Sequence, residues 1–231
     1  MSEKDNSFTG NQIKQSNMVL GESISKFELP EQFTNDINNL YDKSKDMLPD
    51  WNTELAGKIK KESLVNPILT DDMNKIFKMC FHQYMVSSGL FTLRTQKLKL
   101  DNAWINEMKA GEYNPAHFHS GKASLLGLSS VLFLKIPSTY GKEASNDDQP
   151  ANGHLEFIGG NQHTLAISQY RLNPKVGDFF VFPYTLVHTV YPFNGTDEVR
   201  RTLSYNCDII PQTEQDIKEQ NMQKTHGVSA M

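Results

Sequence analysis

The chain has 231 residues, 38% of them apolar, and a formal net charge of -4. This length and composition suffice to bury a hydrophobic core and are typical of a single domain. The weak negative charge offers no electrostatic footprint for a phosphate backbone, which argues against nucleic acid as a partner. No run approaches the roughly 20 apolar residues of a membrane span, so we expect no membrane association. Two cysteines without CxxC spacing, Cys80 and Cys207, are typical of a reducing compartment, and we expect a cytoplasmic location.

The first half of the chain is predicted to be helical after a flexible start. Residues 1–17 are polar and rich in Asn, Ser and Gln, so we expect them to be flexible. Across residues 30–89, apolar side chains recur at steps of three and four, which predicts a layer of amphipathic helices. Thr70 and the acidic pair after it are typical of a helix start, and Gly89 of a helix stop. The recurring apolar positions are Phe33, Ile37 and Leu40, and then Met73, Ile76, Phe77, Cys80 and Tyr84.

Residues 90–210 show a different pattern, with short β-branched and aromatic runs between Gly, Pro, Asn and Asp. Such runs predict the strands of a sandwich or barrel, so the expected fold is mainly β with flanking helices (α+β). Residues 138–152 are too polar to pack, and we expect either a lid over a site or a mobile tip. Residues 211–231 are expected to form a polar tail. The predicted strands lie in LFTLRTQKLKL, AWINEMK, SLLGLSSVLFLKIP, GHLEFIG, HTLAISQYRL, DFFVFP, VHTVYPF and VRRTLSYNCDII.

A pair of histidines in this β half is a candidate for metal binding. His117 and His119 lie in the run YNPAHFH, and residues two apart on a strand face the same side, so both can reach one metal ion. A third ligand must come from elsewhere, and His154, His163 and His188 are the candidates. His188 lies between the apolar runs FPYTLV and TVYPF, at the kind of strand end where barrels build sites. By itself, the pair favours an incidental interpretation, since histidines also lie on solvated faces.

An arginine then strengthens the case for a site. Arg200 lies twelve residues beyond His188, and Thr202 shares its strand face. A guanidinium fork with a hydroxyl beside it suits a carboxylate ligand.

Together these runs resemble the iron(II)/2-oxoglutarate oxygenases, and specifically their prolyl-4-hydroxylase-like, phage-type branch. MKAGEYNPAHFH is similar to the family's segment of a glycine, an aromatic residue and then His-x-Asp/His. SSVLFLKIP resembles the strand that follows, VGDFFVFPYTLVHTVYPF the segment with the distal metal ligand, and RRTLSYN the arginine strand that closes the barrel. TELAGKIKKE, upstream, is similar to a Leu-Ala-Gly segment of the same branch. The resemblance covers residues 19–210.

The resemblance implies a double-stranded β-helix, a cupin-like jelly roll, over residues 90–210. With the helical layer it would form one oxygenase domain over residues 18–210. His117, His119 and His188 would bind Fe(II). The implied reaction is hydroxylation of a C–H bond with release of succinate and CO2, and no side chain is expected to act as a general base.

The resemblance also implies a pocket for the co-substrate, 2-oxoglutarate. Arg200 would grip the distal carboxylate, with Thr202 beside it. Arg201 is the alternative, but its side chain should face away if Arg200 faces in. Asn106 is a further candidate for this pocket, with a hydrogen bond at the strand edge as the simpler interpretation. An apolar wall would come from residues that are primarily core: Leu132, Leu134, Phe180, Phe182 and Val190.

His119 departs from the usual pattern, because most of these enzymes have a carboxylate there. Three neutral histidines leave the iron at +2, which dianionic 2-oxoglutarate would neutralise, and the all-imidazole set also suits Zn, Ni or Cu. The phage-type branch tolerates this histidine. Glu112 and Glu156 are nearby carboxylates, but both are expected on solvated strand positions. His154 and His163 are expected at the surface.

The resemblance favours a prolyl or other residue of a protein or peptide as substrate. A small metabolite or a nucleobase is the alternative, and Trp104, Tyr113 and Tyr184 are aromatic candidates for stacking on either kind of ring. A cupin-like metal-binding protein without 2-oxoglutarate turnover is the other alternative. If the chain is phage-encoded, its location would be the host cytoplasm. The oligomeric state is not predicted.

Overall fold

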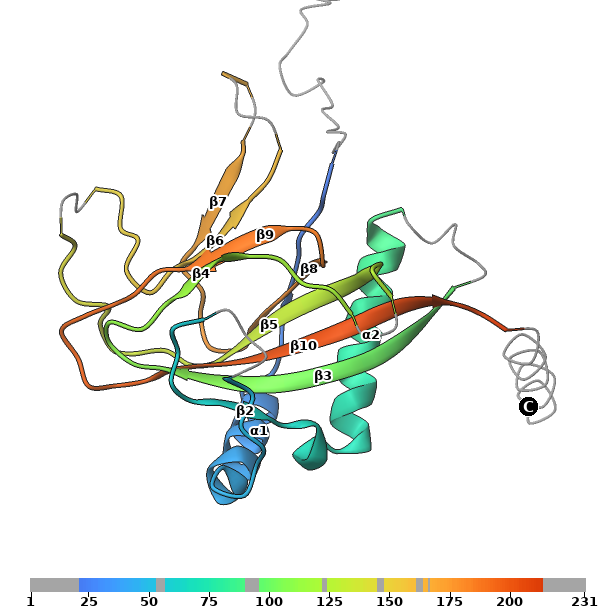
Figure 1. The fold of residues 1–231 in the computed structure, drawn as a ribbon, viewed down its shortest axis with the longest axis horizontal. Helices are drawn as coiled ribbons and strands as arrows, with labels where there is room; N and C mark the ends of the chain where they lie inside the picture. Colours follow the sequence, from blue (N-terminus) through green and yellow to red (C-terminus); the bar gives the residue numbers. More distant parts are fainter. Residues whose placement is uncertain are drawn as a thin grey trace, which may run out of the picture.

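The structure is a computed structural model that describes residues 21–52, 57–89, 96–121, 124–144, 148–160, 164–165 and 167–213. Over these residues the chain folds into two antiparallel β-sheets with two α-helices packed against the larger one (Figure 1). The predicted class, mainly β with flanking helices, is confirmed. None of the described helices has the length and apolar character needed to cross a membrane.

The two sheets bring together strands that are far apart in sequence. Within the described residues, the larger sheet has the order β1-β8-β5-β10-β3-β2 and the smaller has the order β4-β9-β6-β7. The larger sheet contains β1 (Ser25–Glu28), β8 (Asp178–Pro183), β5 (Gly127–Lys135), β10 (Arg200–Pro211), β3 (Gln96–Met108) and β2 (Glu62–Leu64). The smaller sheet contains β4 (Asn114–His117), β9 (Val187–Val190), β6 (Leu155–Ile158) and β7 (Gln169–Leu172).

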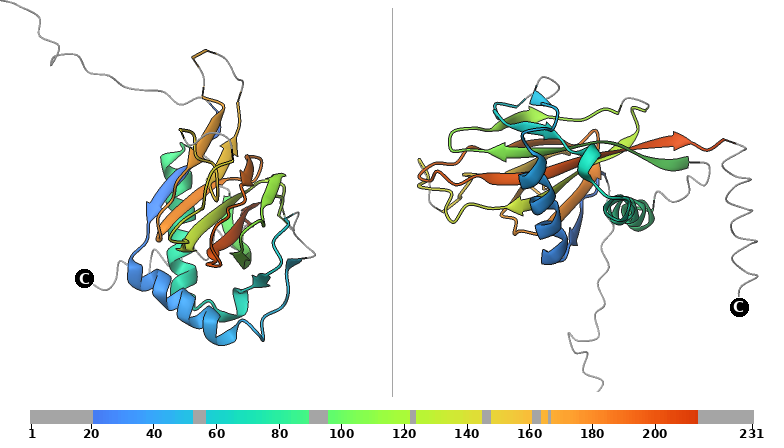
Figure 2. Two further views of the ribbon diagram at one scale, coloured as in Figure 1. Left: turned by 90° about the vertical axis from the view of Figure 1, so that its left-hand side faces the viewer. Right: turned by 90° about the horizontal axis from the view of Figure 1, so that it is seen from below.

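Two helices cover the outer face of the larger sheet: α1 (Glu31–Ser44) and α2 (Asp71–Ser87), with a short 3-10 turn, η3 (Asn66–Ile68), between them (Figure 2). The Thr70 hydroxyl accepts a hydrogen bond from the Met73 backbone N–H at 3.3 Å, which confirms the predicted start of α2. Phe77 of α2 packs edge-on against Phe179 of β8 and Tyr205 of β10, with ring centroids 5.4 and 5.3 Å apart. Helices and sheet thus share one aromatic core.

Side chains of β10 point alternately into that core and into the space between the two sheets. Leu203, Tyr205 and Cys207 point into the core under the helices. Arg200 and Thr202 point the other way, toward the smaller sheet. A second apolar cluster fills much of the space between the sheets, and polar side chains line the rest. This cluster contains Ile59, Met108, Val131, Phe133, Leu155, Phe157, Phe180, Phe182, Leu186, Val190 and Phe193.

Several strand predictions were wrong in extent. β3 runs without a break through two predicted strands, and β1 and β2 were not predicted at all. β2 lies within residues 30–89, where only helices were expected. Both missed strands are short edge strands held by pairing with β8 and β3, and three or four residues are too few to show an alternating pattern.

The polar segment 138–152 is tied to its surroundings at its start and hydrogen-bonded within itself near its end. The backbone N–H of Ser138 donates to Glu198 at 2.5 Å, and that of Ala151 donates to Glu143 at 2.8 Å. The motion expected of this segment stays a prediction. The start at residues 1–17 lies outside the described residues, as does the predicted tail beyond residue 213.

Candidate metal and co-substrate site

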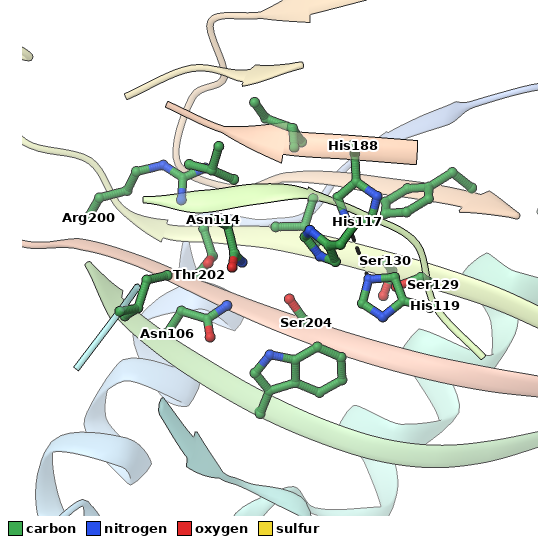
Figure 3. A pocket seen from close by; sticks show the side chains of 16 residues that line it. Asn106, Asn114, His117, His119, Ser129, Ser130, His188, Arg200, Thr202 and Ser204 are labelled. Atoms are coloured by element: carbon green, nitrogen blue, oxygen red, sulfur yellow. Dashed lines mark hydrogen bonds between the residues drawn. The ribbon is translucent and has the colours of Figure 1, made fainter. Parts of the chain in front are cut away.

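Three histidines meet between the two sheets. His117 ends β4 and His188 lies in β9, and the register of these strands pairs the two residues directly. His119 follows β4, and its backbone N–H donates to the Tyr184 carbonyl at 2.9 Å. One ligand atom from each ring lies within 4.8 Å of the other two. Figure 3 shows the three rings gathered at one end of a cleft.

The hydrogen bonds of two rings orient their lone pairs. Nδ1–H of His117 donates to the Pro115 carbonyl at 2.7 Å, and Nδ1–H of His188 donates to the Leu186 carbonyl at 3.0 Å. This tautomer leaves each Nε2 as a lone-pair donor for a metal ion. Nε2 of His119 and Nε2 of His188 are 3.2 Å apart. Two nitrogens bound about 2 Å from one metal ion have about that separation.

The cluster is held in the neutral form that binds metals. Burial lowers the pKa of His117, and burial together with the charge of His117 lowers the pKa of His188 to about 3. Burial is also the largest cause that holds the pKa of His119 well below its usual value, followed by its two neighbours. Neutral imidazoles with exposed lone pairs are the donors that Fe(II) and other first-row metals bind. The three side chains therefore fit a metal ion.

Arg200 lies at the other end of the same cleft (Figure 3). Its side chain is 2% exposed, and its guanidinium lies over the Phe133 ring at 4.7 Å. Among the described residues, neither Nε nor Nη2 has a hydrogen-bond partner. Burial lowers the pKa of Arg200, opposed by Tyr140. A buried cation with unpaired donors is costly unless an anion binds, so the position fits a carboxylate of a ligand.

Tyr140 is a site residue that the sequence did not indicate. Its ring packs on Phe193 and His154, with centroids 5.8 and 6.0 Å away. The phenol oxygen is buried near Arg200 without a well-formed hydrogen bond to any described residue. Burial raises the pKa of Tyr140, so the phenol stays protonated and can donate. Nothing in the polar run STYGKE distinguishes this tyrosine from a loop residue.

All six residues predicted for the site line one cleft that opens to solvent. Trp104 and Ser204 extend its polar floor. Arg201 faces the opposite side of the sheet, where it donates to Asp42 at 2.7 Å and to Glu107. The six predicted residues are His117, His119, His188, Arg200, Thr202 and Asn106.

The two carboxylates considered as alternative metal ligands have other partners. Glu112 accepts from the Lys109 backbone N–H at 2.9 Å. Glu156 accepts from Arg171 at 3.1 Å and from the Tyr191 hydroxyl. Both are buried, so the expectation of solvated positions was wrong. Neither belongs to the group of described residues that can share one metal ion.

Two further expectations were wrong. Leu132 and Leu134 lie in the core under the helices, while Val131 and Phe133 face the cleft side. An apolar run without polar punctuation does not show which of its two faces is which, and the pairing of β5 with β10 decides it. His154 is 7% exposed instead of lying at the surface, because Tyr140 covers it. His163 lies outside the described residues.

Comparisons with known proteins agree with this site. Residues 102–206 match a family model described as "Putative 2OG-Fe(II) oxygenase". None of the curated proteins matches the chain. Among solved structures, a prolyl-4-hydroxylase from Pseudomonas putida is similar over 83% of this chain and 94% of its own, with 13% identity and a TM-score of 0.51.

Two other solved structures show the same likeness. The viral collagen prolyl hydroxylase of Paramecium Bursaria Chlorella virus-1, solved with 2OG, covers 80% of this chain and 94% of its own at 16% identity and a TM-score of 0.50. The non-heme alpha ketoglutarate dependent carbocyclase SnoK of nogalamycin biosynthesis covers 83% and 82% at 12% identity and a TM-score of 0.54. At these identities the likeness shows the fold, a double-stranded β-helix. Residues 102–206 thus match the model of the 2OG-Fe(II) oxygenases, a family of enzymes that use iron(II) and 2-oxoglutarate, and the similar solved structures have the same fold.

Proposed function

We propose that this chain hydroxylates a C–H bond of a protein or peptide, a prolyl residue first among the candidates. The substrate C–H, O2 and 2-oxoglutarate would become C–OH, succinate and CO2. One observation carries the proposal: a cluster of three neutral histidines shares a cleft with a buried arginine, two of whose donor atoms have no partner among the described residues. A metal ion and a carboxylate would satisfy both groups at once.

In this proposal His117, His119 and His188 hold the iron. The bound iron supplies the oxidation chemistry, which protein side chains lack. Three neutral ligands leave the charge of the ion at +2, and the dianionic co-substrate neutralises it. Electrostatic attraction for 2-oxoglutarate is thus greater than at a site where a carboxylate ligand already reduces the charge.

Arg200 and Tyr140 orient the co-substrate. The guanidinium donates to the distal carboxylate through the two nitrogens that lack partners, and the phenol adds a third donor. Phe133 under the guanidinium keeps this end of the cleft poor in water, which strengthens each charged hydrogen bond. Thr202 lines the same stretch of the cleft. The arginine side chain therefore determines which way round 2-oxoglutarate binds.

The choice of a peptide substrate rests on the structural neighbours. Three of them are named prolyl hydroxylases, and one of these, from Trichoplax adhaerens, was solved with a peptide fragment and has 9% identity and a TM-score of 0.51. A small molecule is the second candidate, because the carbocyclase of nogalamycin biosynthesis has a TM-score of 0.54. Exposed aromatic side chains beside the histidines, Tyr113 and Phe118, are available to either kind of substrate.

The test is an anaerobic titration of the metal-free protein with Fe(II) and then with 2-oxoglutarate. We expect a visible metal-to-ligand charge-transfer band in wild type and no band in Arg200→Met at the same concentrations. Arg171→Lys, on the far strand β7, is the control and should keep the band. Bound iron without a band in wild type would contradict the proposal and favour a metal protein without 2-oxoglutarate turnover. With oxygen admitted, a mass increase of one oxygen atom in prolyl peptides, and not in small molecules, would identify the substrate class.

A further inference from the structure

A row of side chains crosses the larger sheet from its edge into the cleft. Glu62 of β2 is paired with Asn106 of β3, and Asn106 with Thr202 of β10. Directly opposed residues of antiparallel strands project from the same face. Asn106 and Thr202 line the cleft, where Figure 3 shows them side by side, so Glu62 projects from that same face. β2 is the edge strand next to β3 (Figure 1).

Glu62 and Asn106 both present oxygens that lack donors. Glu62 is 2% exposed and Asn106 is 6% exposed. Within the described part of the chain, Oε1 of Glu62 and Oδ1 of Asn106 have no hydrogen-bond partner. Buried acceptors without partners are uncommon in native proteins and call for an explanation.

Glu107, the neighbour of Asn106 in β3, is an example of a buried carboxylate with a structural role. Glu107 follows Asn106 in β3 and points to the opposite face. There it accepts from Nε of Arg201 at 3.0 Å, and Lys61 lies 3.9 Å away. The carboxylate on the outer face is therefore compensated by two basic groups, whereas no basic group among the described residues is paired with Glu62.

The charges that act on Glu62 are themselves acidic. Burial is the largest cause that raises its pKa to about 7, followed by Asp50 and Glu112. Glu112 precedes Asn114, which lines the cleft, by two residues, and Asp50 is bridged to Ser63 beside β2. The acidic surroundings of Glu62 therefore favour a cation, while the surroundings of Arg200 favour an anion.

We propose that Glu62 and Asn106 form a subsite for a cationic nitrogen of the substrate, an ammonium or guanidinium group. Such a group has only donors, and this subsite presents two acceptor oxygens, Oε1 of Glu62 and Oδ1 of Asn106, that lack donors among the described residues. Trp104, two positions from Asn106 on the same strand face, also lines the cleft and offers an aromatic surface to a cation. The proposal rests on the function proposed above. It assigns Asn106 together with Glu62 to the substrate, in place of the co-substrate role expected from the sequence, and leaves Arg200 to 2-oxoglutarate.

The competing explanation is a closed structural pair. A neutral Glu62 would donate its proton to Oδ1 of Asn106, and no ligand would be needed. The two explanations predict different behaviour towards a cation. If Glu62 and Asn106 form a subsite, a cation binds there and favours the ionised carboxylate. If they form a structural pair, no acceptor is free and the cation does not bind.

The experiment uses tryptophan fluorescence, because the backbone N–H of Trp51 donates to the Glu62 carbonyl at 2.8 Å and Trp104 lines the cleft. The probes are Nα-acetyl-lysine amide and Nα-acetyl-arginine amide, with Nα-acetyl-norleucine amide as the uncharged analogue. Blocked pentapeptides with lysine or norleucine at the centre form the second arm. Each is titrated anaerobically at pH 8 into protein that holds Fe(II) and 2-oxoglutarate.

We expect wild type to bind the cationic probes at least about tenfold more tightly than the norleucine probe, the effect of one buried charged hydrogen bond. Glu62→Gln should reduce this preference to less than about twofold. Glu28→Gln removes the same charge from an exposed position on β1 and should leave the preference intact. A preference in the peptide arm alone would identify a protein substrate, and one in both arms a small cationic molecule.

Equal affinity of wild type for charged and uncharged probes would overturn the proposal, as would an unchanged preference in Glu62→Gln. If Glu62→Gln does not fold, wild type still decides the matter. Affinity for the lysine probe should fall about tenfold from pH 8 to pH 6 as Glu62 takes up its proton, while affinity for the norleucine probe stays constant. The charge-transfer band is recorded in the same samples. A band without cation preference refutes the subsite alone, and a missing band in wild type refutes the proposed oxygenase function.

Discussion

Replacement of Arg200 by methionine should stabilise the empty protein while it destroys co-substrate binding. Arg200 is buried, and two of its nitrogens have no partner in the part of the chain that the structure describes. Each buried unsatisfied donor costs about 1–3 kcal/mol. Methionine keeps most of the aliphatic stem but loses the contact with Phe133, worth about 1–2 kcal/mol. The net gain in unfolding free energy is about 2 kcal/mol, and for a domain of this size it raises Tm by about 4–8 °C.

The neighbouring Arg201 is the matched control, because its replacement by methionine should lower Tm instead of raising it. Arg201→Met also removes a buried guanidinium, but this one is paired with Asp42 and Glu107. Loss of one partner from a buried ion pair costs about 3–5 kcal/mol, so Tm should fall by roughly 10 °C. The two adjacent residues differ only in the face of β10 from which they project.

Thermal unfolding of the metal-loaded proteins, with and without 2-oxoglutarate, measures both effects. The increase in stability from a ligand is RT ln(1 + [L]/Kd). In wild type, Tm should rise with 2-oxoglutarate concentration. In Arg200→Met the rise should be absent up to concentrations about thirtyfold higher, since a buried charge pair contributes at least about 2 kcal/mol. If Arg200→Met lowered Tm as much as Arg201→Met, or kept its response to 2-oxoglutarate, the assignment of Arg200 would be wrong.

Three other changes test the site. His119→Asp should keep iron(II) binding, since a carboxylate restores the usual donor set, whereas His119→Ala should weaken it at least about tenfold; equal affinities of wild type and the alanine variant in a chelator competition would remove His119 from the metal site. Tyr140→Phe deletes one neutral donor and should raise the Kd for 2-oxoglutarate about three- to tenfold, and an unchanged Kd would place the phenol away from the carboxylate. Glu62 has a folded pKa of about 7 against an ordinary value of 4.5, so the folded state loses stability as pH rises between these values. The unfolding free energy of Glu62→Gln, measured against that of wild type, should therefore rise by about 3 kcal/mol from pH 5 to pH 8. Parallel pH profiles of the two proteins in urea unfolding would contradict this.

Sequence patterns were sufficient to predict which side chains share a face when all of them lie on one strand. Alternation along a strand predicted that Arg200 and Thr202 share a face and that Arg201 faces away, and the structure places them so. The same rule put His117 and His119 on one side. The start of α2 at Thr70 followed from capping chemistry, which involves only neighbouring residues.

The same rule failed in the run VLFL of β5, where no polar residue shows which side of the strand faces the helices. β5 reads GLSSVLFLK, and either set of alternate apolar residues suits a core. Pairing with β10 placed Leu132 and Leu134 under the helices and Val131 toward the cleft. The register also shifts between Arg201 and Thr202, an irregularity that no local pattern indicates.

The sequence by itself therefore determined the class of the fold, the histidine pair and the arginine with its hydroxyl neighbour. The local pattern left three candidates for the third histidine and the family resemblance favoured His188, but only the tertiary structure shows how His188 reaches His117, through the pairing of β4 with β9. It alone brought Tyr140 to Arg200 and Glu62 into a row with Asn106. The physical reason is that such contacts depend on the register between strands distant in sequence, and register is set by the packing of the whole sheet.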